Sequence, residues 1–125
     1  MGGVTLDAGP LIGLERGDSG VRDWVDFMTR GRALIGVPSP VLAEVWRGGA
    51  RSARLARAVK SFEVVSLDAA TARHAGELLA VVGGGATIDA MVVATAAQRG
   101  DAVLTSDPDD LAPLAHAAGV HLAAF

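Results

Sequence analysis

Four acidic residues stand out because each lies where a strand changes to a helix, or on a helix face beside an apolar strip. They are Asp7 in VTLDAGPLI, Glu44 in SPVLAEVWRGG, Asp89 in GATIDAMVVATAA and Asp107 in AVLTSDPDDL. Carboxylates that are brought together repel one another, by roughly 4 kcal/mol per pair at ~4 Å and an effective dielectric of about 20. A bound divalent cation removes this cost. The four residues therefore indicate a metal site and metal-dependent chemistry.

The elements that must position these acids alternate along the chain. Short apolar runs predict strands at 4–6, 33–37, 63–67, 102–105 and 120–124. Helical spacing, capping residues and Pro or Gly boundaries predict helices at about 11–15, 19–28, 40–47, 50–60, 69–82, 87–100 and from 108 onward. Strands separated by helices predict a parallel sheet covered on both faces.

Each acid taken alone also has an ordinary structural explanation. Asp7 and Asp107 precede helices, where Asp is a preferred N-cap. Asp89 falls in a first helical turn, where the helix dipole favours a negative charge by ~0.3–1 kcal/mol. Glu44 fits a solvent-facing helix position as well as it fits a site. The joint pattern is stronger, because strand ends in open α/β sheets face the ligand crevice and no lysine lies near these acids.

The available donors at such a site are oxygen atoms only. The chain has no cysteine, and its three histidines are scattered. Carboxylate ligands without thiolates favour a hard cation such as Mg²⁺ or Mn²⁺. Asp110 can share one side of its turn with Asp107, whereas Asp109 is expected to face solvent.

The bulk composition limits the function classes. A chain of 125 residues that is 50% hydrophobic is long enough for one domain with a real core. The formal net charge of −3 gives no global signal for nucleic acid, so RNA or DNA binding would need a local basic patch. Neither a signal peptide nor a bilayer-spanning apolar run is apparent, and we expect a soluble cytoplasmic protein without membrane contact.

One basic stretch provides such a candidate patch. It contains Arg47, Arg51, Arg54, Arg57 and Lys60, with no acid between Glu44 and Glu63. Arg47, Arg51 and Arg54 are expected to share a helical face one turn from Glu44. The stretch fits a solvated helix face and an RNA phosphate-binding ridge equally well.

Together these segments resemble the PIN-domain ribonucleases, specifically the VapC-type toxins of bacterial toxin–antitoxin pairs. The resemblance covers nearly the whole chain and rests on VTLDAGPLI, PVLAEVWRGG, IDAMVVATAAQRG and AVLTSDPDDL. The order, spacing and context of the four acids agree with the family pattern. There is one departure: family members often carry Thr or Ser directly after the first acid, whereas Ala8 and Gly9 follow Asp7.

The resemblance implies a fold and a set of site residues. The fold would be a three-layer α/β/α sandwich with a central parallel sheet, in a single domain at 1–125. Asp7, Asp89 and Asp107 would be ligands of Mg²⁺, with Mn²⁺ as an alternative ion. Glu44 would help to orient the attacking water, either from behind the metal ligands or as a ligand of a second metal ion. Thr105 matches a hydroxyl residue that precedes the last acid by two positions.

The resemblance also implies an activity and partners. The activity would be hydrolysis of RNA phosphodiester bonds, leaving a 5′-phosphate and a 3′-hydroxyl. The partners would be the RNA substrate, a second copy of the chain in a homodimer, and a cognate antitoxin protein that occludes the site.

Two other functions fit parts of the sequence. A receiver-type phosphoacceptor domain is also a parallel α/β protein with an acidic Mg²⁺ pocket, but it needs paired acids at the first strand end and a late lysine. Here the only lysine is Lys60, in the middle of the chain. The second alternative is a PIN-like module that binds a partner without catalysis, which metal-dependent RNA cleavage would distinguish from an enzyme.

Overall fold

The structure, a computed structural model, describes residues 3–124. Within these residues, five parallel strands form one sheet in the order β3-β2-β1-β4-β5. The strands are β1 (Val4–Leu6), β2 (Ile35–Pro38), β3 (Glu63–Val65), β4 (Ala102–Thr105) and β5 (Leu122–Ala124). Central β1 pairs with both β2 and β4, and Thr5 lies opposite Gly36 and Val103. The carboxyl ends of β1 and β4 are therefore neighbours.

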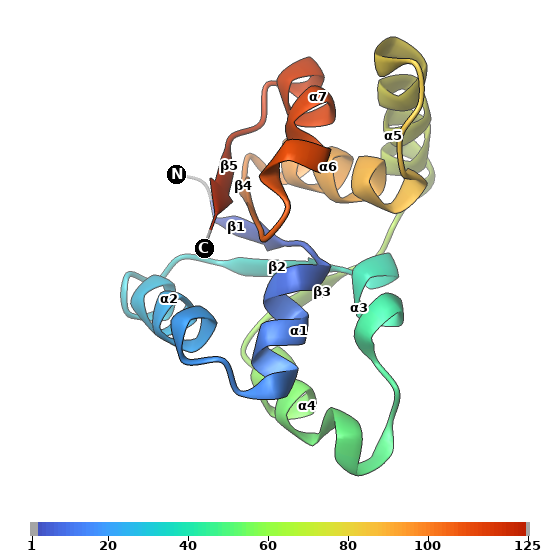
Figure 1. The fold of residues 1–125 in the computed structure, drawn as a ribbon. Coiled ribbons are helices and arrows are strands. Elements are labelled where there is room, and N and C mark those ends of the chain that lie inside the picture. The colour runs from blue at the N-terminus through green and yellow to red at the C-terminus, as the bar shows by residue number, and fades with distance from the viewer. Residues whose placement is uncertain (1–2, 125) are drawn as a thin grey trace.

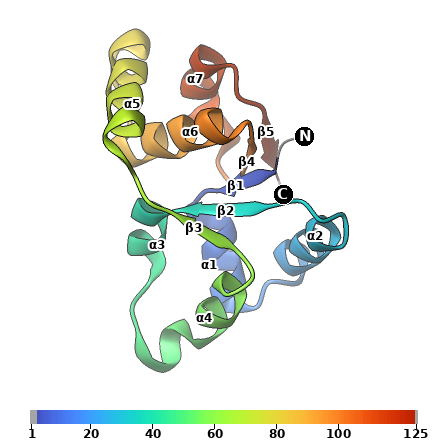
Figure 2. The ribbon, with the colours of Figure 1, turned by 180° about the vertical axis from the view of Figure 1, so that it is seen from behind.

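Helices cover both faces of the sheet. They are α1 (Ala8–Arg16), α2 (Ser19–Arg30), α3 (Ser39–Val45), the short 3-10 helix η1 (Gly49–Ser52), α4 (Ala53–Val59), α5 (Ala69–Val82), α6 (Thr87–Arg99) and α7 (Pro108–Ala118). Helices α1 to α4 lie on one face, below the sheet in Figure 1, and α5 to α7 lie on the other (Figures 1 and 2). The predicted three-layer α/β/α sandwich with a central parallel sheet is confirmed.

The core lies on both sides of the central strands. Leu6, Val37 and Leu104 are fully buried, as expected of apolar strands with a helical layer on each face. On one side α6 is the inner helix, and its residues 92–96 are buried against the sheet and α5. Because α6 leads into β4, its amino end points back toward the carboxyl ends of the strands. That geometry places Asp89 at the same edge as Asp7.

No single helix within residues 3–124 is long and apolar enough to span a membrane. Only α5 and α6 taken together satisfy length and composition, as a pair bent by 117°.

Local capping signals set several helix starts. The Asp18 carboxylate accepts the Val21 N–H at 3.1 Å to begin α2, and the Asp68 carboxylate accepts the Thr71 N–H at 2.7 Å to begin α5. Ser39 is the first residue of α3, and Pro38 occupies the cap position.

The segment after α3 departs from the prediction. The helix ends at Val45 rather than near Arg47, and the helix predicted at 50–60 is divided into η1 and a shorter α4. Gly48 and Gly49 have φ angles of 81° and 59°, a region that favours glycine. The Ser52 hydroxyl accepts the N–H groups of Arg47 and Gly48 at 2.9 and 3.0 Å, and so fixes the turn. The arginines therefore do not share one continuous helical face.

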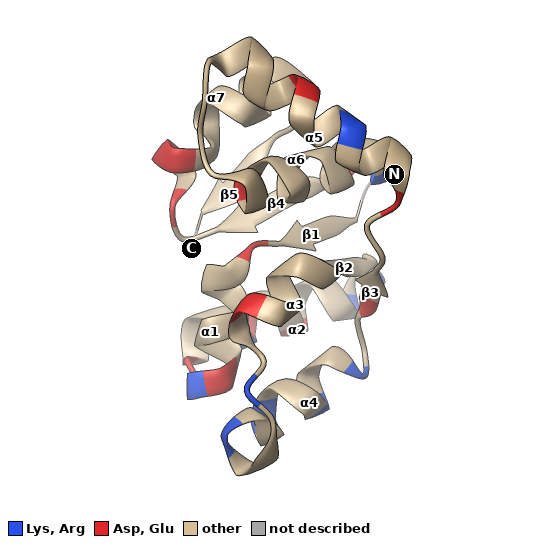
Figure 3. Cartoon of the chain, turned by 90° about the vertical axis from the view of Figure 1, so that its right-hand side faces the viewer, with Lys and Arg blue, Asp and Glu red and all other residues tan. Residues whose placement is uncertain are grey.

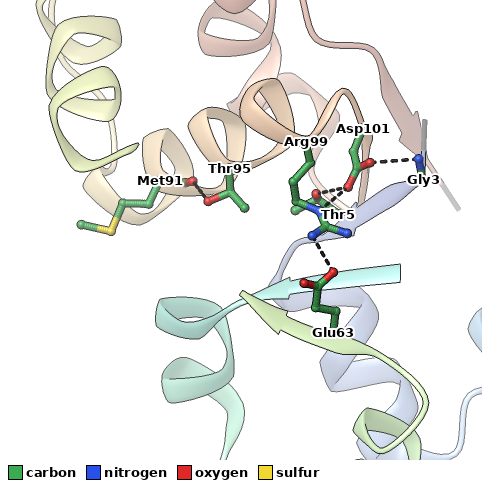
Figure 4. Close-up of polar contacts among 7 residues, drawn as sticks. All are labelled: Gly3, Thr5, Glu63, Met91, Thr95, Arg99 and Asp101. Atoms are coloured by element: carbon green, nitrogen blue, oxygen red, sulfur yellow. Dashed lines mark hydrogen bonds and ion pairs between the residues drawn. The ribbon is translucent and has the colours of Figure 1, made fainter. Parts of the chain in front are cut away.

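A buried ion pair lies at the amino end of the sheet (Figure 4). Asp101, only 7% exposed, accepts hydrogen bonds from the Gly3 N–H at 2.9 Å, the Thr5 hydroxyl at 2.8 Å and Arg99 Nε at 2.8 Å. A second Arg99 nitrogen donates to Glu63 at 2.8 Å. A Cβ on Gly36 would lie 2.9 Å from the guanidinium, so a larger residue there would displace the Arg99 side chain. The network joins β1, β3 and β4.

Candidate active site

The turns after β1 and β4 bring the first and last predicted acids to one place. The Asp7 N–H donates to the Leu104 carbonyl at 3.0 Å, which fixes the end of β1 against β4. A Cβ on Gly9 would collide with the Ser106 hydroxyl, so glycine at this position allows α1 to approach the β4–α7 turn. The sequence therefore places Asp7 and Asp107 on two turns in direct contact.

Thr105 connects these two turns through its hydroxyl group. The hydroxyl donates to Asp7 Oδ2 at 2.9 Å and accepts the Asp107 N–H at 2.9 Å. Thr105 is fully buried and Asp7 is only 7% exposed, so this contact is largely shielded from water. The side chain at 105 thus orients the Asp7 carboxylate and holds the backbone of Asp107.

The structure excludes the capping explanation for these two acids. Asp7 precedes α1 and Asp107 precedes α7, but neither side chain makes a capping hydrogen bond. Asp18 and Asp68 show that this chain can use Asp as a cap where the geometry allows it. Helix capping therefore leaves the carboxylates of Asp7 and Asp107 unexplained.

Asp89 is the acid most affected by its neighbours. It lies in the first turn of α6 and is partly buried. Burial raises the pKa of Asp89, and the carboxylates of Asp7, Asp110, Glu44 and Asp107 raise this pKa further, in that order. Each of these four groups must lie close enough for its charge to act on Asp89. The structure thus brings all four main predicted acids and Asp110 into one region.

Glu44 approaches the cluster from α3, on the opposite helical layer. Burial raises its pKa, and the charge of Asp7 raises this pKa further. Figure 3 shows acidic segments at the end of β1, on α3 and at the start of α7, and basic segments gathered around α4. Among residues 3–124, no ion pair with an arginine or lysine involves any of the five clustered acids. Their negative charges are therefore not compensated by the protein.

The carboxylates are neighbours without forming a coordination shell. Within the part of the chain that the structure describes, no three Asp, Glu or His side chains converge closely enough to hold a metal ion as they stand. Asp7 is held by Thr105, whereas Asp107 and Asp110 are exposed. The donor set fits a hard cation because every donor is a carboxylate oxygen, but the side chains must rotate to share one ion.

The three predicted RNA-contact arginines occupy different surroundings. The Arg47 guanidinium donates a hydrogen bond to the Trp46 carbonyl at 2.8 Å. Arg51 Nε forms an ion pair with Glu15 Oε1 at 3.6 Å. Both line a groove of about 200 Å³ that also contains Glu44. Arg54 donates to the Arg16 carbonyl at 3.0 Å and lines a larger cavity. The structure brings Arg47 and Arg51 beside Glu44 and separates Arg54 from it.

Comparison with known proteins identifies the family. The PIN domain model matches residues 4–118, a span that includes every acid of the cluster. The chain therefore belongs to the PIN domain family, and the resemblance inferred from the sequence is confirmed at this level. The comparison with curated proteins gave no match.

Solved structures with the same fold come from toxin–antitoxin complexes. A chain of VapBC2 from Rickettsia felis, bound to a promoter DNA fragment, is 16% identical with a TM-score of 0.79, and the match covers 98% of both chains. A chain of DNA-bound VapBC from Salmonella typhimurium is 20% identical with a TM-score of 0.77, covering 99% of this chain and 98% of that one. A toxin–antitoxin complex from Klebsiella pneumoniae gives 18% identity and a TM-score of 0.71, covering 87% and 90%. At these identities the likeness establishes the fold.

Proposed function

We propose that this protein is a divalent-cation-dependent endoribonuclease that acts, as one domain, as the toxin of a toxin–antitoxin pair. The observation that carries the proposal is the uncompensated acidic cluster, in which burial and four neighbouring carboxylates raise the pKa of Asp89. Membership of the PIN domain family and the fold shared with chains of VapBC complexes support it.

The proposed cation is Mg²⁺, with Mn²⁺ as an alternative ion. Asp7, Asp89 and Asp107 would hold it, because they approach the same edge of the sheet from three separate elements. Asp110 and Thr105 would support this set, Asp110 through its charge and Thr105 by fixing Asp7. When bound, such an ion lowers the pKa of its water and neutralises charge on the phosphate.

Glu44 is suited to orienting the attacking water. Its raised pKa makes it a better proton acceptor than an ordinary surface glutamate. In the proposed hydrolysis the water oxygen forms a bond to phosphorus, its proton passes to Glu44, and the bond from phosphorus to the 3′ oxygen breaks. The products are a 5′-phosphate and a 3′-hydroxyl, and the leaving oxygen takes its proton from solvent.

Arg47 and Arg51 are proposed to contact RNA phosphates in the groove beside Glu44, and Arg54 more remotely. Such contacts position a nucleic acid without reading its sequence. Because the protein carries a net negative charge, a local basic surface of this kind is required to bring RNA toward an acidic centre.

The proposed partners follow from the same family context. We propose that a cognate antitoxin occludes the site and that the chain forms a homodimer in the cytoplasm. The antitoxin partner is supported by the solved structures of similar fold, which are chains of toxin–antitoxin complexes. Light scattering of the purified chain, alone and with the protein encoded beside it, measures both associations.

The test is cleavage of a mixed small-RNA pool by the wild type and by Asp89→Asn, each with Mg²⁺ and with EDTA. We expect cleavage only by the wild type with Mg²⁺. The substitution should lower the rate by at least about 100-fold, because even residues behind the metal ligands commonly contribute 10–100-fold.

Asp109→Asn is the matched control, since Asp109 is an exposed acid of the same region that does not act on Asp89. It should cleave like the wild type. Undiminished Mg²⁺-dependent cleavage by Asp89→Asn would refute the site. An RNA pool left intact by the wild type in all conditions would favour the non-catalytic interaction module.

A further inference from the structure

A cavity between α1, α2 and α4 lies away from the acidic cluster. It has a volume of about 630 Å³ and is formed by the end of α1, the α1–α2 turn, α2 and α4. None of the acids assigned to the site lines it. A cavity of this size lies within the roughly 300–1,000 Å³ range of ligand sites. Of the residues in the proposed function, only Arg54 lines this cavity.

The charge of this cavity favours an anion. Within the described lining, four arginines face two aspartates: Arg16, Arg22, Arg54 and Arg57 against Asp18 and Asp26. The Asp18 carboxylate is already engaged as the cap of α2. The net positive charge therefore remains available to a ligand.

Two of these arginines are held in place by the end of α1. Arg54 donates to the Arg16 carbonyl at 3.0 Å, and Arg22 donates to the Gly17 carbonyl at 3.4 Å. Gly17 has a φ of 75°, and a Cβ there would lie 2.9 Å from the Arg54 guanidinium. A guanidinium has five N–H donors, so each of these groups keeps donors for an anion.

Within residues 3–124, the other two arginines have no protein partner. Among the described residues, Arg16 and Arg57 make neither an ion pair nor a side-chain hydrogen bond. Both are exposed, and half-buried Phe62 lies in the same cavity wall. Basic groups beside an aromatic surface are what single-stranded nucleic acid binds, through phosphate contacts and base stacking.

Arg16 joins this cavity to the active-site groove. It lines both the 630 Å³ cavity and the 200 Å³ groove that contains Glu44. Helix α1 has nine residues, so its end lies about 13 Å from the Asp7 end. A short stretch of extended RNA can follow α1 from the acidic cluster, past Arg51, into the cavity.

We infer that the cavity between α1, α2 and α4 anchors backbone phosphates of the RNA strand at a distance from the bond that is cleaved, chiefly through Arg16 and Arg57. The inference rests on the proposed ribonuclease function and extends it with a second substrate-binding region. Its contacts are independent of sequence, because they reach phosphate rather than base edges.

The experiment measures RNA affinity without cleavage. Fluorescence anisotropy of labelled polyuridylate, in EDTA over a series of KCl concentrations, compares the wild type with the double variant Arg16→Ala/Arg57→Ala. The double variant should bind more weakly. Its plot of log affinity against log salt should be shallower by about 1.4, since each single-strand phosphate contact contributes about 0.7.

The matched control is Arg30→Ala/Arg73→Ala, which removes the same charge from exposed positions outside the cavity. Its salt dependence should equal that of the wild type. Equal slopes for the two double variants would overturn the inference. If the slopes were equal and Arg16→Ala/Arg57→Ala also lost antitoxin binding, the cavity would be assigned to a protein partner. A wild type that neither binds nor cleaves RNA would refute the proposed function itself.

Discussion

Two aspartates at opposite ends of the same sheet are equally buried and have opposite surroundings. Asp101 at the amino end and Asp7 at the carboxyl end are each 7% exposed. Asp101 is paired with Arg99 and accepts two further hydrogen bonds. Asp7 accepts a hydrogen bond from Thr105 and acts on the carboxylates of Glu44 and Asp89.

The difference separates a compensated carboxylate from an uncompensated one, and we propose that the second is functional. A buried charge is tolerated when an opposite charge and hydrogen bonds compensate it, as Arg99 does for Asp101. At the carboxyl end the fold supplies more negative charge instead of compensation. An arrangement of that kind costs stability, and perturbed acids in such surroundings are typical of functional sites.

The largest expected effect is a loss of stability when the Arg99–Asp101 ion pair at the amino end of the sheet is broken. Replacing Arg99 by Met should lower the free energy of unfolding by about 3–5 kcal/mol, because Asp101 would remain buried without its counter-charge. Urea denaturation measures the loss, and the control is Arg73→Met at an exposed position of α5. RNA cleavage per folded molecule should stay unchanged. A loss below about 1 kcal/mol would mean that Asp101 needs no compensation, and would remove the contrast with Asp7.

A smaller loss is expected from Thr105→Val, which keeps the shape of the side chain. The variant leaves Asp7 Oδ2 and the Asp107 N–H without their shared partner, at a cost of about 1–3 kcal/mol. Cleavage should fall as well, since Asp7 is no longer held toward β4. Thr105→Ser retains the hydroxyl and should recover much of the activity. If Thr105→Val cleaved RNA as fast as the wild type, Thr105 would have no positioning role.

The smallest expected effect is a gain in stability for Asp89→Asn, measured in EDTA. The folded-state pKa of Asp89 is raised above its ordinary value of 3.8, so the folded state holds more protons on this group than the unfolded state does. The contribution of Asp89 to stability therefore falls as pH rises from its unfolded-state pKa to its folded-state pKa, and it stays unfavourable at pH 7. Asn should raise the free energy of unfolding by roughly 0.5 kcal/mol at pH 7, after solvent screening.

The pH dependence tests this explanation. The advantage of Asp89→Asn should disappear at a pH low enough to protonate Asp89 in both states, as thermal melts across a pH series can show. Asp109→Asn is again the control, since it removes an exposed acid of the same region that does not act on Asp89. An Asp89→Asn protein that is less stable than the wild type at pH 7 would mean that its neighbours do not destabilise this carboxylate.

Local sequence signals predicted those parts of the fold that depend on neighbouring residues. The strand at 102–105 and the helix at 69–82 are as expected, because strand pattern and capping act over a few residues. The helix predicted at 50–60 is present as the 3-10 turn η1 followed directly by α4. Composition does not reveal that its first turn is 3-10, nor that the Ser52 hydroxyl holds the turn before it.

The site was predictable only as a set of candidates. The positions of the acids at strand ends indicated which side chains to consider, but the Thr105–Asp7 contact spans 98 residues of sequence. The Arg99–Asp101 pair was not anticipated, since QRGDA looks like an ordinary helix end and its other partners, Gly3 and Thr5, lie at the far end of the chain. Arg16 also escaped notice, because its cavity exists only once α1, α2 and α4 are packed.

The central claim is that the uncompensated end of the sheet binds a divalent cation and the compensated end does not. Thermal melts with increasing Mg²⁺ test this most directly, using the wild type, Asp89→Asn and Glu63→Gln, the last removing an acid at the amino end. We expect Mg²⁺ to stabilise the wild type and Glu63→Gln alike, approaching about 2.7 kcal/mol at 100 times the dissociation constant, and to stabilise Asp89→Asn far less. An equal response of all three proteins, or none in the wild type, would contradict it.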